Sequence, residues 1–157
     1  MEKNLRDWLS AIRRYLAVTV AGHLVWEALH VPLYGIWEEG NTAEIAFAVV
    51  HCTGGDLLIA LTSLVGALML AGSPRWPARR FHVVAALTIA FGVLYTIYSE
   101  WLNVSVRGSW SYSARMPILP LLGTGLSPLL QWIVVPGAAL VATRLSDRRE
   151  ASALDAG

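Results

Sequence analysis

Apolar runs long enough to cross a bilayer dominate this chain, and short polar segments separate them. The runs cover about residues 15–36, 45–72, 81–102 and 116–143. A helix needs about 20 apolar residues to span a hydrocarbon core of about 30 Å. Each run meets that length, so the pattern predicts four transmembrane helices.

The segments between the runs are polar turns that are too short to form a domain of their own. Residues 36–44 are acidic, residues 72–80 are basic and contain two prolines, and residues 103–115 are polar and aromatic. Such compositions favour turns and loops. The expected fold class is therefore all-α, an integral membrane bundle of four helices in one domain at residues 15–143.

The two ends of the chain carry most of its charge. Residues 1–14 combine charges with apolar positions at helical spacing, which predicts an interfacial amphipathic segment, and residues 144–157 are expected to form a flexible cytoplasmic tail. Ten of the 12 Lys and Arg residues fall on one side when four spans are threaded. The positive-inside rule then places both termini in the cytoplasm, as in a multi-pass protein of the cell inner membrane.

Composition supports the membrane class and narrows the partners. The chain is 55% hydrophobic and 15% charged, and its mean hydropathy of +0.52 lies outside the range of an ordinary soluble domain. A net charge of +1 gives no reason to expect nucleic acid. The expected partners are the lipid bilayer and a hydrophobic small molecule or lipid, and a homodimer is compatible with this pattern.

One polar stripe interrupts the first apolar run. His23, Glu27 and His30 fall within an arc of about 60° on one helix face at about 100° per residue. No other charged residue lies between Arg14 and Glu38. Ionisable groups at membrane depth are costly and usually face a bundle interior or a wet cavity. The stripe therefore predicts a functional site.

Counting from the middle of each run at about 1.5 Å per residue places the polar groups in two layers. The layer within about 3 Å of the midplane holds Glu27, Asp56 and Gln131. A second layer, about 8–12 Å toward the outer surface, holds His30, His51 and Glu100. Two acids in one dry layer cannot both ionise cheaply, so we expect them to share at least one proton.

Four short motifs follow one another through the runs: H-x-x-x-E at His23 and Glu27, an acid at Asp56, YTIYSE ending at Glu100, and QWIVVPG with Trp132. Their order resembles the emopamil-binding, or EXPERA, superfamily, which includes the sterol Δ8–Δ7 isomerases and the sigma-2 receptor. The resemblance implies a helical bundle around a carboxylate-containing lipid pocket. It also implies that Trp132 stacks over a ligand cation or carbocation.

These residue types suit isomerase-type proton transfer independently of the resemblance. A carboxylic acid that stays neutral in hydrocarbon can protonate an alkene while a second carboxylate or a His removes a proton from a neighbouring carbon. The expected acid/base residues are Glu27, Asp56 and His23. The residues expected to bind the ligand are Trp132, Gln131, Glu100 and Tyr98. The same groups would bind an amphipathic amine without turnover, so the sequence leaves open whether the protein is an enzyme.

Two other classes of function compete with this interpretation. His30 and His51 belong to no motif of the superfamily, and Asp56 stands where its isomerases have Glu. The two histidines would suit the axial ligands of a b-type haem or, with Glu44, a divalent metal site, although the main interpretation includes no cofactor. The third alternative is a non-catalytic membrane subunit whose polar interior fixes helix pairing.

Overall fold

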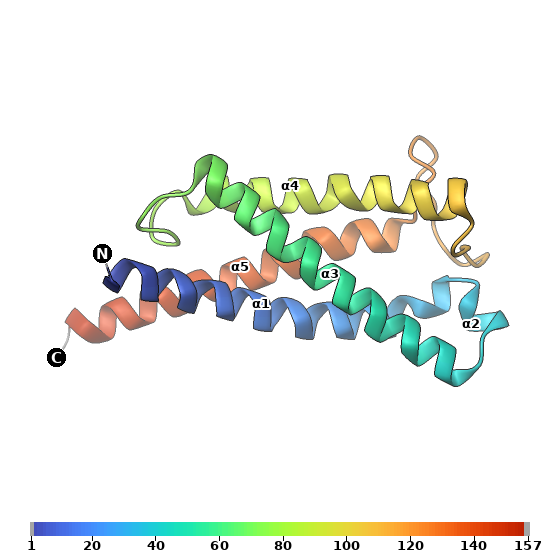
Figure 1. Ribbon diagram of the computed structural model, residues 1–157, viewed down its shortest axis with the longest axis horizontal. Coiled ribbons are helices and arrows are strands. Elements are labelled where there is room, and N and C mark those ends of the chain that lie inside the picture. Colours follow the sequence, from blue (N-terminus) through green and yellow to red (C-terminus); the bar gives the residue numbers. More distant parts are fainter. Residues whose placement is uncertain (1, 156–157) are drawn as a thin grey trace.

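The computed structural model describes residues 2–155, which form an antiparallel bundle of four long helices (Figure 1). The long helices are α1 (Glu2–His30), α3 (Thr42–Ala71), α4 (Phe81–Glu100) and α5 (Leu126–Asp155). Shorter elements are the 3-10 turn η1 (Val31–Leu33), the helical turn α2 (Ile36–Glu39) and the π-helix η2 (Trp101–Arg107), which continues α4. Residues 2–155 contain no strand beyond isolated bridges, so the all-α prediction is confirmed.

The long helices have the length and surface of membrane spans. Within residues 2–155, four stretches are long and apolar enough to cross a membrane, namely Arg6–Leu33, Thr42–Ala71, Phe81–Arg107 and Leu126–Glu150. Large apolar side chains are exposed on them, with Leu29 76% and Met69 83% exposed. Extensive apolar surface of this kind is unusual on a protein surrounded by water. The chain therefore has the features of a multi-pass membrane protein.

The boundaries of α5 differ from the predicted span. The helix begins at Leu126, because the first part of the predicted span is a loop that contains Pro117 and Pro120. Proline has no backbone N–H to donate in a helix interior, and Gly123 adopts a positive φ of 63° that favours glycine. At its other end α5 continues to Asp155, so most of the segment predicted as a flexible tail is helical.

The first helix also extends further than predicted. The segment at 1–14, expected to lie apart from the first span, is continuous with it, since α1 runs without interruption from Glu2. Arg14 of α1 forms an ion pair with Glu150 of α5, which connects the two helices near the end of α5. The interfacial position of residues 1–14 stays a prediction.

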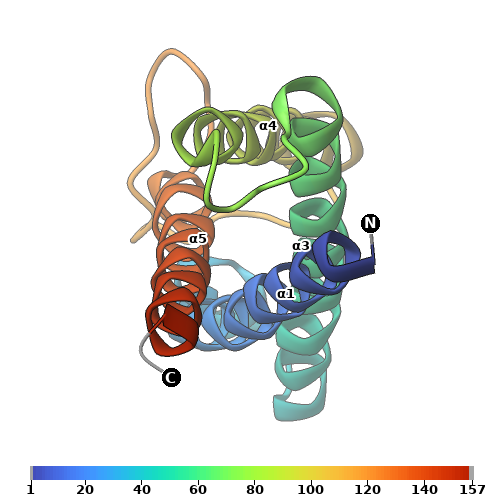
Figure 2. The same cartoon turned by 90° about the vertical axis from the view of Figure 1, so that its left-hand side faces the viewer.

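Viewed along the bundle, α4 lies opposite α1 and α5 lies opposite α3, which runs obliquely across the bundle (Figure 2). Helix α1 packs against α3 and α5, and α4 packs against the same two helices. The start of α1, the end of α5 and the 72–80 turn lie at one end of the bundle (Figure 1). We call it the basic end, because it carries Arg13, Arg14, Arg75, Arg79, Arg80, Arg144, Arg148 and Arg149. The opposite end, with α2 and η2, is called the loop end.

The apolar core lies toward the basic end. Its residues include Ala60, Leu64 and Ala67 from the second half of α3, all of which are fully buried. Trp76 of the 72–80 turn is 2% exposed and meets the ring of Trp8 edge-on, with ring centroids 6.1 Å apart. Because the second half of α3 supplies this packing, its first half remains available to line a cavity.

Two glycines bring α5 close to its neighbours. A Cβ atom at Gly92 of α4 would lie 2.1 Å from Cε3 of Trp132, and one at Gly22 of α1 would lie 2.7 Å from Cγ1 of Val135. Neither distance is tolerable, so the absence of a side chain permits these helix contacts. Gly55, in contrast, has nothing within 4 Å of such a Cβ and lines the cavity described below.

Candidate functional site

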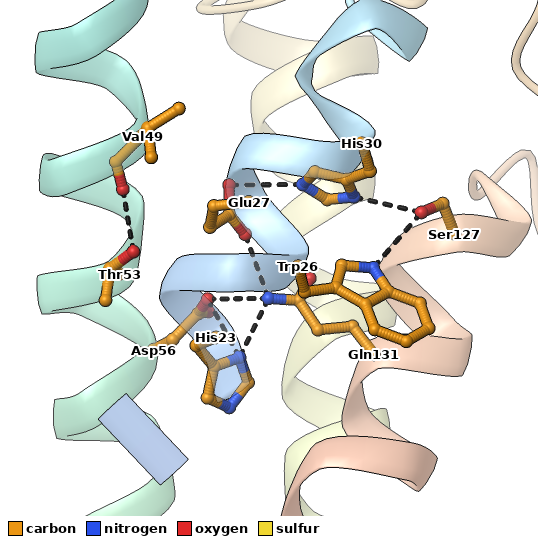
Figure 3. Close-up of polar contacts among 9 residues, drawn as sticks. All are labelled: His23, Trp26, Glu27, His30, Val49, Thr53, Asp56, Ser127 and Gln131. Atoms are coloured by element: carbon orange, nitrogen blue, oxygen red, sulfur yellow. Dashed lines mark hydrogen bonds and ion pairs between the residues drawn. The ribbon is translucent and has the colours of Figure 1, made fainter. Parts of the chain in front are cut away.

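A polar cluster joins three helices at the middle of the bundle. The side-chain nitrogen Nε2 of Gln131 on α5 lies 2.9 Å from Oε1 of Glu27 on α1 and 2.9 Å from Oδ2 of Asp56 on α3. It also lies 2.8 Å from Nδ1 of His23, and this Nδ1 is 3.2 Å from Oδ2 of Asp56 (Figure 3). We call His23, Glu27, His30, Asp56 and Gln131 the polar cluster. It unites all of the expected acid/base residues.

The hydrogens of the polar cluster are interdependent. A carboxamide NH₂ group carries two hydrogens, but three potential acceptors surround Nε2 of Gln131. If Nδ1 of His23 carried a proton for Asp56, it would face Nε2 of Gln131 as a second donor at 2.8 Å. The amide can therefore donate to at most two of His23, Glu27 and Asp56 at once. A proton shift at one residue consequently changes the preferred state of the others.

His30 extends the cluster toward the loop end. Its Nε2 lies 3.1 Å from Oε2 of Glu27, and its Nδ1 lies 3.0 Å from the hydroxyl oxygen of Ser127. The indole N–H of Trp26 donates to the same hydroxyl at 3.3 Å (Figure 3). Each of the two carboxylates thus has its own histidine, His30 for Glu27 and His23 for Asp56.

Trp132 forms an aromatic wall beside the cluster. It is 2% exposed, and its ring centroid lies 5.0 Å from that of His23 at an interplanar angle of 47°. The side chain also contacts the position of Gly92, which fixes where the indole can lie. The indole of Trp132 therefore lies next to the residues expected to act as acid and base.

A cavity of about 1120 Å³ opens from the cluster toward the loop end. This volume exceeds the range of about 300–1,000 Å³ typical of small-molecule sites. Its apolar lining includes Phe47, Ile59, Tyr95 and Trp132, and the polar cluster contributes Glu27, His30, Asp56 and Gln131. The cavity therefore combines a large, mostly apolar space with ionisable groups at its base. His23 is not part of the cavity lining and is fully buried.

Near the cavity mouth, Glu100 receives a hydrogen bond from the hydroxyl of Tyr112. The backbone N–H of Gly125 donates to the same hydroxyl at 2.9 Å, so Tyr112 ties the 108–125 loop to α4. Burial and the adjacent Glu100 carboxylate raise the pKa of Tyr112 above its ordinary value. Burial, together with Glu100, likewise raises the pKa of Tyr34, whose ring lies 5.6 Å from that of Tyr112. Both tyrosines are therefore neutral at physiological pH.

The predicted ligand-binding residues divide into two groups. Gln131, Trp132 and Glu100 line the cavity. Tyr98 does not: it is 53% exposed and packs its ring 6.1 Å from that of Trp101. Tyr95, one turn earlier on α4, lines the cavity instead.

The alternative metal ligands all line the cavity, but other contacts engage them. Both ring nitrogens of His30 have partners, so binding a haem iron would require one of them to be released. His51 is exposed and stacks on Phe47 at 5.4 Å. The carboxylate of Glu44 accepts the backbone N–H of Asn41 at 2.8 Å and so caps α3. Within the described chain, no group of three or more His, Cys, Asp or Glu residues is arranged to hold a metal ion.

Ser127 and Tyr112 were not among the site residues predicted from the sequence. Ser127 shares a helical face with Gln131 at four-residue spacing, and this spacing was the available signal that both face α1. Tyr112 carried no such signal, because it lies in an irregular loop whose path depends on tertiary contacts. Those contacts include the N–H of Gly35, which donates to the carbonyl of Ser111 at 2.9 Å.

Comparison with known proteins does not assign the chain to a family. No protein-family model matches the chain, and searches of curated proteins and of solved structures give no match either. The EXPERA resemblance therefore stays a prediction from short motifs.

Proposed function

We propose that this protein is a multi-pass inner-membrane protein that binds a lipid-like or amphipathic molecule in the cavity and isomerises a double bond by proton transfer. The observation that carries the proposal is the pairing of two carboxylates, Glu27 and Asp56, each with its own histidine and both bridged by Gln131. The pair lies at the base of a large, mostly apolar cavity. The motif order that resembles the EXPERA superfamily supports the same reaction.

The charge balance of the cluster suits proton transfer. Two carboxylates with two neutral imidazoles would carry a net charge of −2 in a buried site, which is unfavourable. Two added protons make the cluster neutral, and four groups are available to hold them. Proton positions can therefore change while the net charge stays constant.

In the proposed reaction, the acid of the pair donates its proton to one alkene carbon of the ligand, which leaves a cation on the adjacent carbon. The other carboxylate, or its histidine, then removes a proton from the next carbon, and the electron pair of that C–H bond forms the new double bond. One proton enters the ligand and one leaves it. The indole of Trp132 lines the cavity beside these groups and would stabilise the transient cation, since cation–π attraction strengthens away from water.

The charges of the cavity favour a ligand with a positive or neutral head and an apolar body. Its ionisable lining consists of acids and histidines, namely Glu27, Glu39, Glu44, Asp56, Glu100, His30 and His51. Neither Lys nor Arg occurs among the described residues of the lining. An amphipathic amine would therefore compete with the substrate, because its cation resembles the charge of the intermediate.

Deuterium incorporation tests the reaction even while the substrate is unidentified. Purified protein is incubated with a membrane lipid extract in D₂O, and unsaturated lipids are analysed by mass spectrometry. Each isomerisation adds a solvent deuteron and removes a proton, so the product gains one mass unit. Glu27→Gln should abolish the gain, because it removes the acid proton and keeps the shape. Glu38→Gln is the matched control, since Glu38 is exposed and outside the cavity lining. Equal incorporation by wild type and Glu27→Gln would refute the catalytic role.

Reporter fusions test the proposed orientation. Fusions after Ala78 and after Gly157 should report a cytoplasmic location, and a fusion after Gly40 should report the opposite side. These positions follow from the basic residues of the basic end and from the positive-inside rule. A fusion after Gly40 that reports the cytoplasm would contradict the topology and the depths derived from it.

A further inference from the structure

The cavity is closed on one side of the bundle and open on the other. Every lining residue that α1 and α5 contribute is buried, including Glu27, Gln131 and Trp132. The lining residues of α3 and α4, in contrast, include Phe47, which is 68% exposed, and Tyr95, which is 47% exposed. The cavity therefore reaches the outer surface of the bundle between α3 and α4.

The course of α3 explains this side opening. Helices α3 and α4 lie together at the basic end and diverge toward the loop end (Figure 1). Gly55 lines the cavity on the diverging half of α3, and it is exposed and has nothing within 4 Å of its Cβ position. Both helices belong to stretches long and apolar enough to cross a membrane. In a bilayer, the side opening therefore faces lipid chains.

A groove on the outer surface continues from the side opening toward the basic end. It has a volume of about 380 Å³, and its lining comes from α3 and α4, namely Leu58, Ile59, Thr62, Ser63, Phe91 and Tyr95. Ile59 and Tyr95 also line the cavity. The two spaces therefore adjoin at these two side chains.

The groove and the cavity differ in polarity. The cavity holds the acids of the polar cluster, whereas the described lining of the groove contains no charged residue. The hydroxyl of Thr62 donates to the carbonyl of Leu58 within α3 at 2.8 Å, so it needs no partner in the groove. Ser63 is buried. The groove therefore suits a hydrocarbon chain, and the cavity suits a polar or cationic head.

We propose that the ligand extends through the side opening, with its head in the cavity and one alkyl chain in the groove. The substrate class is then an amphiphile with a single long chain. Asp56 and Ile59 are three residues apart on α3, about 4.5 Å along the helix axis, so the sites for head and chain are connected. This inference rests on the proposed function, because it assigns the head of the ligand to the proposed proton-transfer pair.

Photo-crosslinking in nanodiscs tests where the chain lies. The probe is hexadecylamine with a diazirine in the middle of its chain, and mass spectrometry locates the attached residues. Labelling at Leu58, Thr62 and Phe91 should be displaced by excess unlabelled hexadecylamine, because these residues line a binding site. Labelling at Met69, which is exposed on α3 outside both linings, reports contact with bulk lipid and should persist. Displaceable labelling that omits the groove, or none at all, would overturn the proposal.

Two neighbouring glycines provide a matched pair of variants for the side opening. Gly54 and Gly55 are both exposed on α3, and neither has an atom within 4 Å of its Cβ position, so both positions accept a side chain. Only Gly55 lines the cavity. Gly55→Leu should lower displaceable labelling of the groove by about tenfold or more, because its side chain fills space that the ligand needs. Gly54→Leu should label as the wild type does, and equal labelling of the two variants would contradict passage through the opening.

The crosslinking assay needs no turnover, so its result is separate from that of the isomerisation test. If Glu27→Gln leaves deuterium incorporation into lipids unchanged while the groove is labelled displaceably, the proposed function fails and the chain site stands. If deuterium incorporation depends on Glu27 but the groove shows no displaceable labelling, the chain site fails and the proposed function stands.

Discussion

Replacing Gln131 by leucine should destabilise the bundle by more than the loss of a single hydrogen bond on the protein surface would. The substitution keeps most of the side-chain volume and removes the amide, whose Nε2 lies 2.8–2.9 Å from groups on His23, Glu27 and Asp56. A buried acceptor that loses its donor costs about 1–3 kcal/mol. Glu27 and Asp56 keep their histidine partners, so the lower limit of that range applies to each contact. The NH₂ group has two hydrogens, so at most two of these hydrogen bonds are lost, which gives a decrease of about 2 kcal/mol in the free energy of unfolding.

Unfolding in mixed micelles, followed by circular dichroism, measures this loss. Asn103→Leu is the control, because the Asn103 amide donates to the carbonyl of Ser99 within the same helical segment at 2.9 Å. Its removal should cost only about 0.5–1 kcal/mol. A Gln131→Leu protein within about 0.5 kcal/mol of wild type, below the net value of an ordinary hydrogen bond, would refute the view that the amide holds the three helices together.

A second substitution at the same position separates charge from shape. Gln131→Glu keeps the size of the side chain but places a third carboxyl group against Glu27 and Asp56. When ionised, it can only accept hydrogen bonds, and it adds negative charge to a buried site. Its stability should therefore rise as the pH falls from about 8 to about 5, whereas the loss in Gln131→Leu should vary much less. Parallel pH profiles for the two variants would contradict this account.

Three further outcomes are expected. Gly92→Ala should destabilise the bundle by about 1–3 kcal/mol through overlap with Trp132, whereas Gly66→Ala, whose Cβ would lie 3.6 Å from its nearest neighbour, should have little effect in the same unfolding assay. Burial and Glu100 raise the pKa of Tyr112. The stability that Tyr112 contributes is therefore complete below the ordinary tyrosine pKa near 10 and is lost as the pH rises above that value. The melting temperature of the wild type should fall more steeply than that of Tyr112→Phe between about pH 9.5 and 11. Purified protein should show neither a Soret band in its absorption spectrum nor stoichiometric metal by elemental analysis. Either signal would support the alternative of a haem or metal site at His30.

The α1 stripe could be predicted from the sequence because an ionisable residue in an apolar helix has few acceptable environments. His23 and Glu27 must face the interior, and depth along the helix then identifies Asp56 and Gln131 as partners. The rotation of the other helices about their own axes, which decides which side chains face the cavity, was harder to predict. Helix α4 has a buried face that carries Thr88, Gly92, Thr96 and Glu100. Tyr95 and Tyr98 both lie off this face, so it does not by itself decide which of them lines the cavity. The structure shows that Tyr95 lines the cavity.

The start of α5 shows the limit of hydropathy as a guide to helix boundaries. Residues 116–125 are as apolar as a span, yet they form a loop that is closed by backbone hydrogen bonds, including that from Leu126 N to Pro117 O at 2.7 Å. The prolines and glycines of this segment carried the signal, since each disfavours a continuous helix. Turn chemistry should therefore take precedence over hydropathy where the two disagree.

The two halves of α3 explain how this bundle can hold a costly polar cluster. The second half supplies Ala60, Leu64 and Ala67 to a fully buried core, while the first half diverges to line the cavity and presents Asp56 at the junction. The apolar core toward the basic end then supplies most of the packing that stabilises the bundle, and the ionisable groups lie at the boundary between this core and the cavity. A substitution that removes a proton but keeps shape, such as Asp56→Asn, should therefore affect proton transfer far more than folding. The same separation means that a loss of activity in such a variant reports on the chemistry of the site.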